Sequence, residues 1–272
     1  MHHHAKTTAS IAARILGTAL LAFAVGASAQ QLKPTPFTQP PQDTTGSLAN
    51  FDVLGVKLGM SESEAVELVK KAFPAGSKDG NGYPIVFKQS DYVLTNPVNH
   101  KPTRAGVKFR VHGNVPDNNY DFIKILVNNG KVWAVWRDDA SANYEADRFA
   151  AMLHGKYPSA AEIISYFDVV EGGRRTNDGT TGVIGARLYA GNCEEAPPLT
   201  HDAADSIKLV NGCSRAFFVK YGGTKTAGVK TVHAGTIELV DLDAGRQFFS
   251  SMKEMAATAA KADAQRGGDA KF

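Results

Sequence analysis

This chain of 272 residues lacks the common sequence motifs of catalytic centres. The histidines after residue 30 form neither H-E-x-x-H nor H-x-H, and no serine lies in a G-x-S-x-G turn. The stretch 222–231, GGTKTAGVKT, resembles a phosphate-binding loop, but an extra residue separates Gly228 from Lys230 and would move the lysine off the phosphates. We therefore predict a hairpin connection there, and no catalytic residue, cofactor or metal site. Carboxylates far apart in the sequence leave a secreted hydrolase open as the alternative.

Cysteine is scarce, because the chain contains only Cys193 and Cys213. No paired C-x-x-C spacing is present, so we favour a disulfide over a metal site built from these cysteines with His201 and Asp202. A bridge would close a loop of about 20 residues and contribute roughly 3 kcal/mol of stability. A disulfide also indicates an oxidising compartment.

Long apolar runs are confined to the N-terminus, and little net charge remains after it. Residues 1–29 have a basic start, an apolar stretch and the small residues Ala27-Ser28-Ala29, a pattern that predicts an export signal cleaved after Ala29. The remainder has 28 basic and 27 acidic residues, a net charge of +1. We expect a periplasmic or secreted protein with no transmembrane segment, no lipid anchor and no nucleic-acid partner.

The rest of the chain predicts an α+β fold with two similar modules. Residues 30–50, rich in Pro, Thr and Gln, are expected to form a flexible leader. Each module has a helix followed by antiparallel strands, the first at 51–140 and the second at 141–252. Ser61 and Glu64 have the spacing of a capping box, so the first helix should start there and end before Pro74. Residues 253–272 should hold the end of a C-terminal helix and a disordered tail.

The clearest structural signal is the stretch IKILVNNGKVWAVWRD at 123–138. Asn129-Gly130 predicts a two-residue hairpin turn of type I′. The predicted register pairs Val127 with Val132, Ile125 with Ala134 and Ile123 with Trp136 on one apolar face, which assigns Trp136 to the core. The opposite face mixes apolar and charged residues and is a candidate contact surface; its apolar members are Phe122, Leu126, Trp133 and Val135. Trp133 either packs beneath another segment or contacts a partner.

Two further stretches are candidates for binding. Arg174 and Arg175 follow two glycines and could receive a carboxylate or a phosphate, although a solvated loop is the alternative. The neighbouring TNDGTTG at 176–182 has the composition of a turn. His201 and Asp202 lie in the acidic loop that Cys193 and Cys213 would close. This loop is either a binding loop or a surface loop that the disulfide holds in place.

The stretch FDVLGVKLGMSESEAVELV at 51–69 resembles the opening of a group of exported proteobacterial proteins, written loosely as G-[IV]-x-L-G-M-S-x-x-E-A. The match is carried by Gly55, Leu58, Gly59, Met60, Ser61, Glu64 and Ala65. The pattern is similar, more distantly, to the helix-then-sheet modules of SmpA/OmlA lipoproteins and of β-lactamase-inhibitor proteins. Those proteins bind other proteins and catalyse nothing, although the lipid-bearing cysteine of the lipoproteins is missing here.

The residues and the resemblance together favour an exported, non-enzymatic binding protein whose partner is a protein or a cell-envelope component. A third interpretation is a carrier of a small ligand or metal that uses the loop around His201.

Overall fold

A computed structural model of the chain describes residues 41–78, 84–112, 121–139, 144–171, 174–193, 199–201, 207–226 and 229–268. The chain divides into two compact units, Met1–Thr38 and Gln39–Phe272, and all of the described residues belong to the second. The predicted export signal lies outside the described residues. Among the helices described, none has the length and apolar character needed to cross a membrane.

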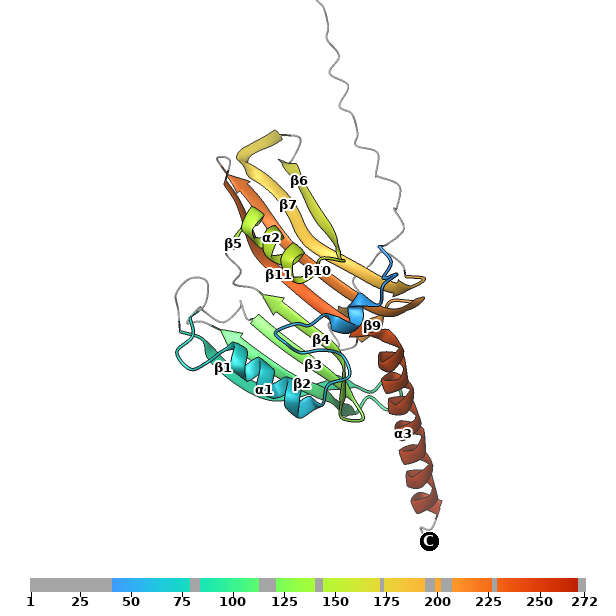
Figure 1. Cartoon of the computed structure of the whole chain (residues 1–272). Helices are drawn as coiled ribbons and strands as arrows, with labels where there is room; N and C mark the ends of the chain where they lie inside the picture. The colour runs from blue at the N-terminus through green and yellow to red at the C-terminus, as the bar shows by residue number, and fades with distance from the viewer. Residues whose placement is uncertain are drawn as a thin grey trace, which may run out of the picture. The chain divides into compact units, whose positions relative to one another are not determined.

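The second unit has an α+β fold built on one antiparallel sheet (Figure 1). Its strands are ordered β1-β2-β3-β4-β11-β10-β7-β6, and the short β5 pairs with β11. A separate hairpin is formed by β8 and β9. The bounds are Val86–Thr95 (β1), Pro102–His112 (β2), Asp121–Asn128 (β3), Lys131–Asp139 (β4), Tyr144–Glu145 (β5), Ala161–Glu171 (β6), Arg174–Gly191 (β7), Leu199–His201 (β8), Ile207–Leu209 (β9), Cys213–Thr226 (β10) and Val229–Asp241 (β11).

The described helices are the 3-10 turn η1 (Ser47–Asn50) and the α-helices α1 (Glu62–Ala72), α2 (Ala146–Lys156) and α3 (Leu242–Gly268). The predicted capping box is confirmed, because the Ser61 side chain accepts the backbone N–H of Glu64 and the Glu64 side chain accepts that of Ser61. The carboxylate of Glu145 caps α2 in the same way, by accepting the N–H groups of Asp147 and Arg148. Local side chains thus fix where both helices begin.

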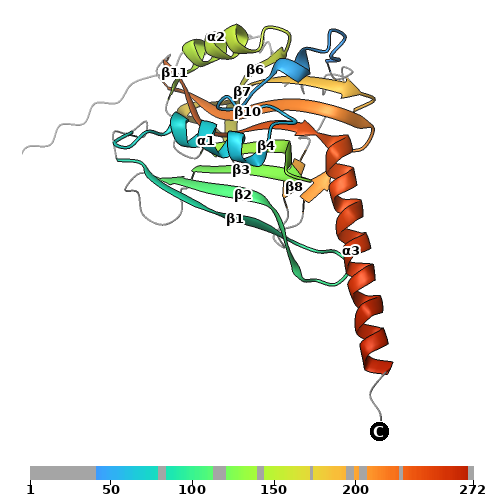
Figure 2. The ribbon, with the colours of Figure 1, turned by 60° about the horizontal axis from the view of Figure 1, so that its bottom comes forward.

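The two faces of the sheet carry separate apolar cores. On one face, η1, α1 and α2 cover residues such as Phe109 and Phe217, both fully buried; we call it the α1/α2 face. On the other, Phe248 and Met252 of α3 cover Trp133, and we call this the α3 face. Figure 2 shows α1 and α2 on one side of the strands, with β8 on the other side near the start of α3.

The β3–β4 hairpin forms as predicted at its turn and differs beyond it. Asn129 and Gly130 both have positive φ, 49° and 73°, as a type I′ turn requires. Val127 pairs with Val132, but Leu126 then pairs with Ala134, so the register predicted for the rest of the hairpin is wrong. The cause is a β-bulge at Trp133, which shifts every later side chain of β4 to the opposite face.

The bulge reverses the predicted orientation of the last part of β4. Val135, expected on the contact face, lies in the core of the α1/α2 face. Trp136 is buried as predicted, but in the core of the α3 face, together with Trp133 and Ala134. The consecutive residues Trp133 and Ala134 both face α3, because the bulge interrupts the alternation of side chains along β4.

Two further stretches differ from the sequence prediction. Residues 41–50, expected in the flexible leader, pack on the sheet: Asp43 donates its N–H to the carbonyl of Tyr189 at 2.6 Å, and Leu48 is 1% exposed. Residues 176–182, expected to form a turn, lie within β7, because the β6–β7 hairpin pairs Glu171 with Arg174 instead. The predicted hairpin at 222–231 is confirmed, since Thr226 of β10 pairs with Val229 of β11.

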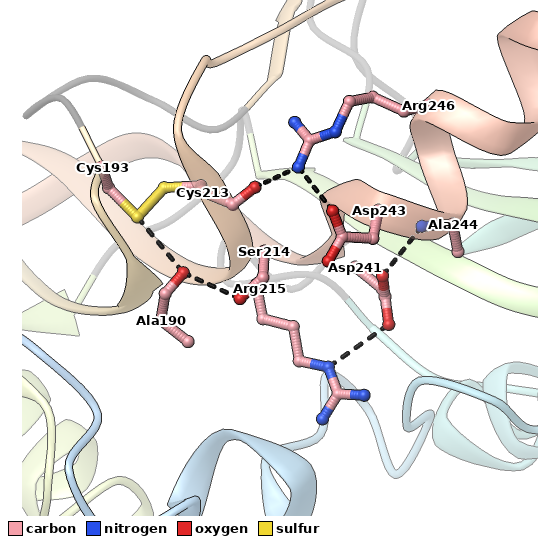
Figure 3. Close-up of polar contacts among 9 residues, drawn as sticks. All are labelled: Ala190, Cys193, Cys213, Ser214, Arg215, Asp241, Asp243, Ala244 and Arg246. Carbon is pink, nitrogen blue, oxygen red and sulfur yellow. Dashed lines mark hydrogen bonds and ion pairs between the residues drawn. A yellow bond between two sulfur atoms is a disulfide. The ribbon is translucent and has the colours of Figure 1, made fainter.

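The predicted disulfide joins Cys193 to Cys213 beside the start of α3 (Figure 3). Arg246 of α3 donates to the carbonyl of Cys213 and pairs with Asp243 at 2.7 Å. The carboxylate of Asp241 accepts the N–H of Ala244 at 2.9 Å and so caps the helix. The disulfide and the first turn of α3 therefore form one polar cluster.

Candidate functional site

A row of polar and aromatic side chains crosses the α3 face of the sheet, away from α3. Strand register places these residues side by side, each directly opposite the next, so their side chains share one face. We call them the outer row; its members are Lys88, Arg110, Phe122, Asp138, Thr236 and Lys220, from β1, β2, β3, β4, β11 and β10.

The outer row is basic and is open to solvent at its two ends, whereas Arg110 Nε and Thr236 Oγ1 in its middle are buried. Lys88 and Lys220, at its two ends, are exposed, and the four residues between them are partly exposed. Its three cations outnumber its one carboxylate, that of Asp138, whose side chain is 34% exposed. Surface of this kind attracts an anionic group by charge and offers Phe122 as an apolar contact.

Phe122 is held in place by a cation from the adjacent register position. The ammonium of Lys108 lies 4.0 Å from the centroid of the Phe122 ring, within the range of a cation–π interaction. Because the ring is only partly exposed, the lysine both covers one side of it and adds positive charge beside it. A partner that contacts the Phe122 ring would therefore also lie close to the positive charge of Lys108.

A second row, which we call the inner row, lies next to the outer row and is mostly buried. Its members are Lys108, Lys124, Trp136, Glu238, Phe218 and Arg187. Lys124 lies 3.9 Å from the centroid of the Trp136 ring and 3.7 Å from the carboxylate of Asp138. The indole N–H of Trp136 donates to the same carboxylate at 2.7 Å. The inner row thereby orients Asp138 in the outer row.

Glu238 is the buried acid of the inner row, at 2% exposure. Its carboxylate accepts the backbone N–H of Leu199 at 3.0 Å, which fastens the β8–β9 hairpin to the sheet. Burial raises the pKa of Glu238 to about 8, the hydrogen bond from Leu199 lowers it, the charge of Asp138 raises it and that of Lys124 lowers it. This carboxyl group therefore holds its proton to a higher pH than an ordinary glutamate does.

The structure separates the residues that the sequence proposed as one contact face. Phe122 lies in the outer row. Trp133 and Leu126 are 1% and 0% exposed beneath α3, so the interpretation of Trp133 as packed under another segment of the chain is the one that agrees with its burial. Val135 is 0% exposed on the opposite face. Neither Trp133, Leu126 nor Val135 is available to a partner in this arrangement.

The other predicted binding residues lie apart from this surface or outside the described residues. Arg174 and Arg175 begin β7, where their backbone pairs with Glu171 and Val170 of β6. His201 ends β8, and Asp202 lies outside the described residues. Within the described ranges, no group of three or more His, Cys, Asp or Glu side chains is arranged to hold a metal ion.

Sequence reasoning missed the cations of the outer row because they come from distant strands. Arg110 and Lys220 each lie between apolar neighbours along a strand, and Lys88 follows Phe87; this is the only signal that the sequence carries. Their assembly into one row depends on strand order and register, and the sequence prediction joined β10 and β11 in a hairpin but gave neither its register nor its place beside β4.

The comparisons with known proteins found no similarity that would assign a function to this site. No protein-family model matches the chain, and no curated protein or solved structure is significantly similar to it.

Proposed function

We propose that the chain is an exported, non-enzymatic binding protein, and that its outer row docks an acidic surface of a protein or cell-envelope partner. The observation that carries this proposal is the placement of Lys88, Arg110 and Lys220 in one solvent-facing row with Phe122. Interfaces of this composition combine an aromatic anchor with charges that steer the partner.

The export part of the proposal is supported by the sequence of residues 1–29 and by the disulfide. A basic start, an apolar stretch and small residues before Gln30 are typical of a cleaved signal. The Cys193–Cys213 bridge fits the oxidising compartments to which such a signal leads. The protein would then meet its partner in the periplasm or outside the cell.

We also propose that the fold consists of two related modules. α1 is followed by β1, β2, β3 and β4, and α2 is followed by β6, β7, β10 and β11, which is the same order of a helix and four antiparallel strands. The last strands of the two series, β4 and β11, pair with each other. The outer row crosses this junction, so both modules would contribute to one docking surface.

A hydrolase is less well supported than a binding protein. The raised pKa of Glu238 is a property of carboxyl groups that act as general acids. However, Glu238 is 2% exposed and holds the N–H of Leu199, so a substrate would have to displace the β8–β9 hairpin to reach it. The hydrogen bond from Leu199 explains the buried Glu238 as a group that holds the β8–β9 hairpin on the sheet.

The proposal is tested by capturing partners from envelope extract and culture medium of the native host on the immobilised, oxidised chain. The test variant carries Lys88→Glu and Lys220→Glu, which reverse two exposed charges of the outer row. We expect it to bind the partner about tenfold more weakly, because like charges then face the acidic surface. Binding to the unaltered chain should weaken as salt rises, since exposed charges are screened beyond about 10 Å at 0.1 M.

A matched control carries Lys71→Glu on α1 and Lys253→Glu on α3, which change the net charge equally at exposed positions outside the outer row. The control should retain the partner. Equal retention by both charge-reversal variants would refute docking at the outer row, and turnover of an envelope polymer by the purified chain would refute a non-enzymatic role.

A further inference from the structure

The α1/α2 face contains a small pocket, of about 170 Å³, that the proposed docking surface does not use. It lies between α2 and the adjoining ends of β4, β10 and β11, with the turn at 53–54 as another wall. Its lining includes Arg137, Asp139, Tyr144, Phe149, Met152 and Lys156.

Aromatic and apolar side chains make up most of this lining. The rings of Tyr144 and Phe149 are stacked with centroids 5.6 Å apart and planes 11° apart. Phe149 in turn contacts the ring of Tyr221, at a centroid distance of 4.7 Å. Tyr144 and Met152 remain 40% and 56% exposed. The pocket therefore has aromatic walls and an exposed apolar edge.

The charged groups of the pocket form two ion pairs in which the cation is the more exposed partner. Arg137 pairs with Asp139 at 3.1 Å, and their side chains are 19% and 3% exposed. Lys156 pairs with Asp52 at 2.9 Å, and their side chains are 42% and 26% exposed. Asp139 also accepts the hydroxyl of Tyr221 at 3.3 Å. Arg137 and Lys156 line the pocket, whereas of the two carboxylates only that of Asp139 does, so the lining has one cation more than carboxylates, which favours an anionic group.

The volume suits a ligand with a single ring. An engineered apolar cavity of about 150 Å³ holds benzene, whereas sites for larger ligands measure roughly 300–1,000 Å³. We propose that this pocket binds a small aromatic carboxylate, with the ring against Tyr144 and Met152 and the carboxylate toward Arg137 and Lys156. The proposal is independent of docking at the outer row, which lies on the other face of the sheet.

Phenylacetate is a suitable probe, because it joins one aromatic ring to one carboxylate. The five methionines of the chain provide the readout, since their methyl groups can be labelled and followed by NMR. We expect phenylacetate to shift the Met152 signal saturably, with a Kd on the order of 1 mM. Met255, equally exposed at 57% on α3, should not shift and serves as an internal control. Benzylamine, which replaces the carboxylate by a cation, should bind at least about tenfold more weakly.

Two substitutions separate the apolar and charged parts of the site. Met152→Ala should weaken phenylacetate binding about fivefold, and the matched Met255→Ala should not change it. Lys156→Gln should also weaken phenylacetate about fivefold, with little effect on neutral benzyl alcohol, because only the carboxylate interacts with the charge. Lys70→Gln, which removes a lysine from an exposed pair on α1, is its control. The binding of benzyl alcohol also reports that the Lys156→Gln pocket remains folded.

Absence of a saturable shift at Met152, or equal binding of phenylacetate and benzylamine, would overturn the proposal. Binding that persists unchanged in Met152→Ala would likewise place the ligand elsewhere. Because partner capture at the outer row is measured separately, failure of this experiment leaves the proposed function as it stands.

Discussion

The two faces of the sheet are built from the same strands but differ in how completely they are covered. The α1/α2 face is apolar across both halves of the sheet, with a continuous core from Val66 of α1 to Leu153 of α2. The α3 face is apolar only where α3 and β9 lie on it, and beyond them it carries the inner and outer rows. One face is thus covered by helices in both halves of the sheet, while the other is covered only in part. The difference follows from α3, which packs at one end of its face.

Removal of Trp133 is the strongest way to break this arrangement. The ring lies 6.0 Å from that of Phe248, and Gly245 approaches it so closely that an added Cβ would be 2.8 Å from the indole. Trp133→Ala should destabilise the chain by roughly 3–5 kcal/mol, because it leaves a cavity under the helix. Urea unfolding measures the change, with Met255→Ala as an exposed control expected to stay within about 0.5 kcal/mol. A loss as small as that of the control would mean that α3 is not docked on Trp133.

Removal of the disulfide tests whether the α3 face can be destabilised without destabilising the α1/α2 face. Replacing Cys193 and Cys213 together by serine should cost about 3 kcal/mol, because the loop of 20 residues is no longer closed. Amide exchange should accelerate first in β8, β9 and the start of α3, where Arg246 contacts the carbonyl of Cys213. Exchange that accelerates equally in α1 and α2 would show that the two faces unfold as one unit.

Glu238 supplies a smaller, pH-dependent effect confined to the α3 face. Its pKa is raised from an ordinary 4.5 to about 8, so the folded chain holds this proton more tightly than the unfolded chain. Its contribution to stability is complete below about pH 4.5 and is lost as pH rises through about 8. The groups that face it are Lys124, Asp138 and the N–H of Leu199.

Glu238→Gln keeps the shape of the side chain and cannot ionise, so the fall in stability from about pH 5 to about pH 8 should become shallower. Urea unfolding midpoints across this range give the slope, and Glu254→Gln, at an exposed position on α3, is the control. If the slopes of the variant and the unaltered chain coincide, Glu238 does not titrate in this way.

Much of the local structure could be predicted from the sequence because its causes are local. Ser61 and Glu64 cap α1 within one turn, and Asn129-Gly130 accept the positive φ of their hairpin. The spacing of Cys193 and Cys213 likewise allowed the disulfide to be expected. The first two features are determined by residues a few positions apart, and the third was expected because the only two cysteines lack the paired spacing of a metal site.

The bulge at Trp133 could not be predicted, because nothing local to β4 requires it. The alternation of apolar residues along 123–138 fits the unbulged register equally well. The bulge turns Trp133 toward α3, and the indole is covered by Gly245 and Phe248 of that helix, more than a hundred positions later. Phe122 was identified as a candidate on the correct strand face, whereas its basic neighbours Arg110 and Lys220 depend on the pairing of β2 and β10.

The strand order also has a consequence for how the chain folds. β4 and β11 pair at the middle of the sheet, where Asp139 lies opposite Gly235 and Ala134 opposite Val240. Until β11 has been synthesised, the N-terminal strands leave the hydrogen-bonding edge of β4 unpaired, and such an edge is a template for aggregation. Because β11 and α3 come last in the chain, the pairing of β4 and the cover over Trp133 both depend on contacts distant in sequence, which are expected to form slowly.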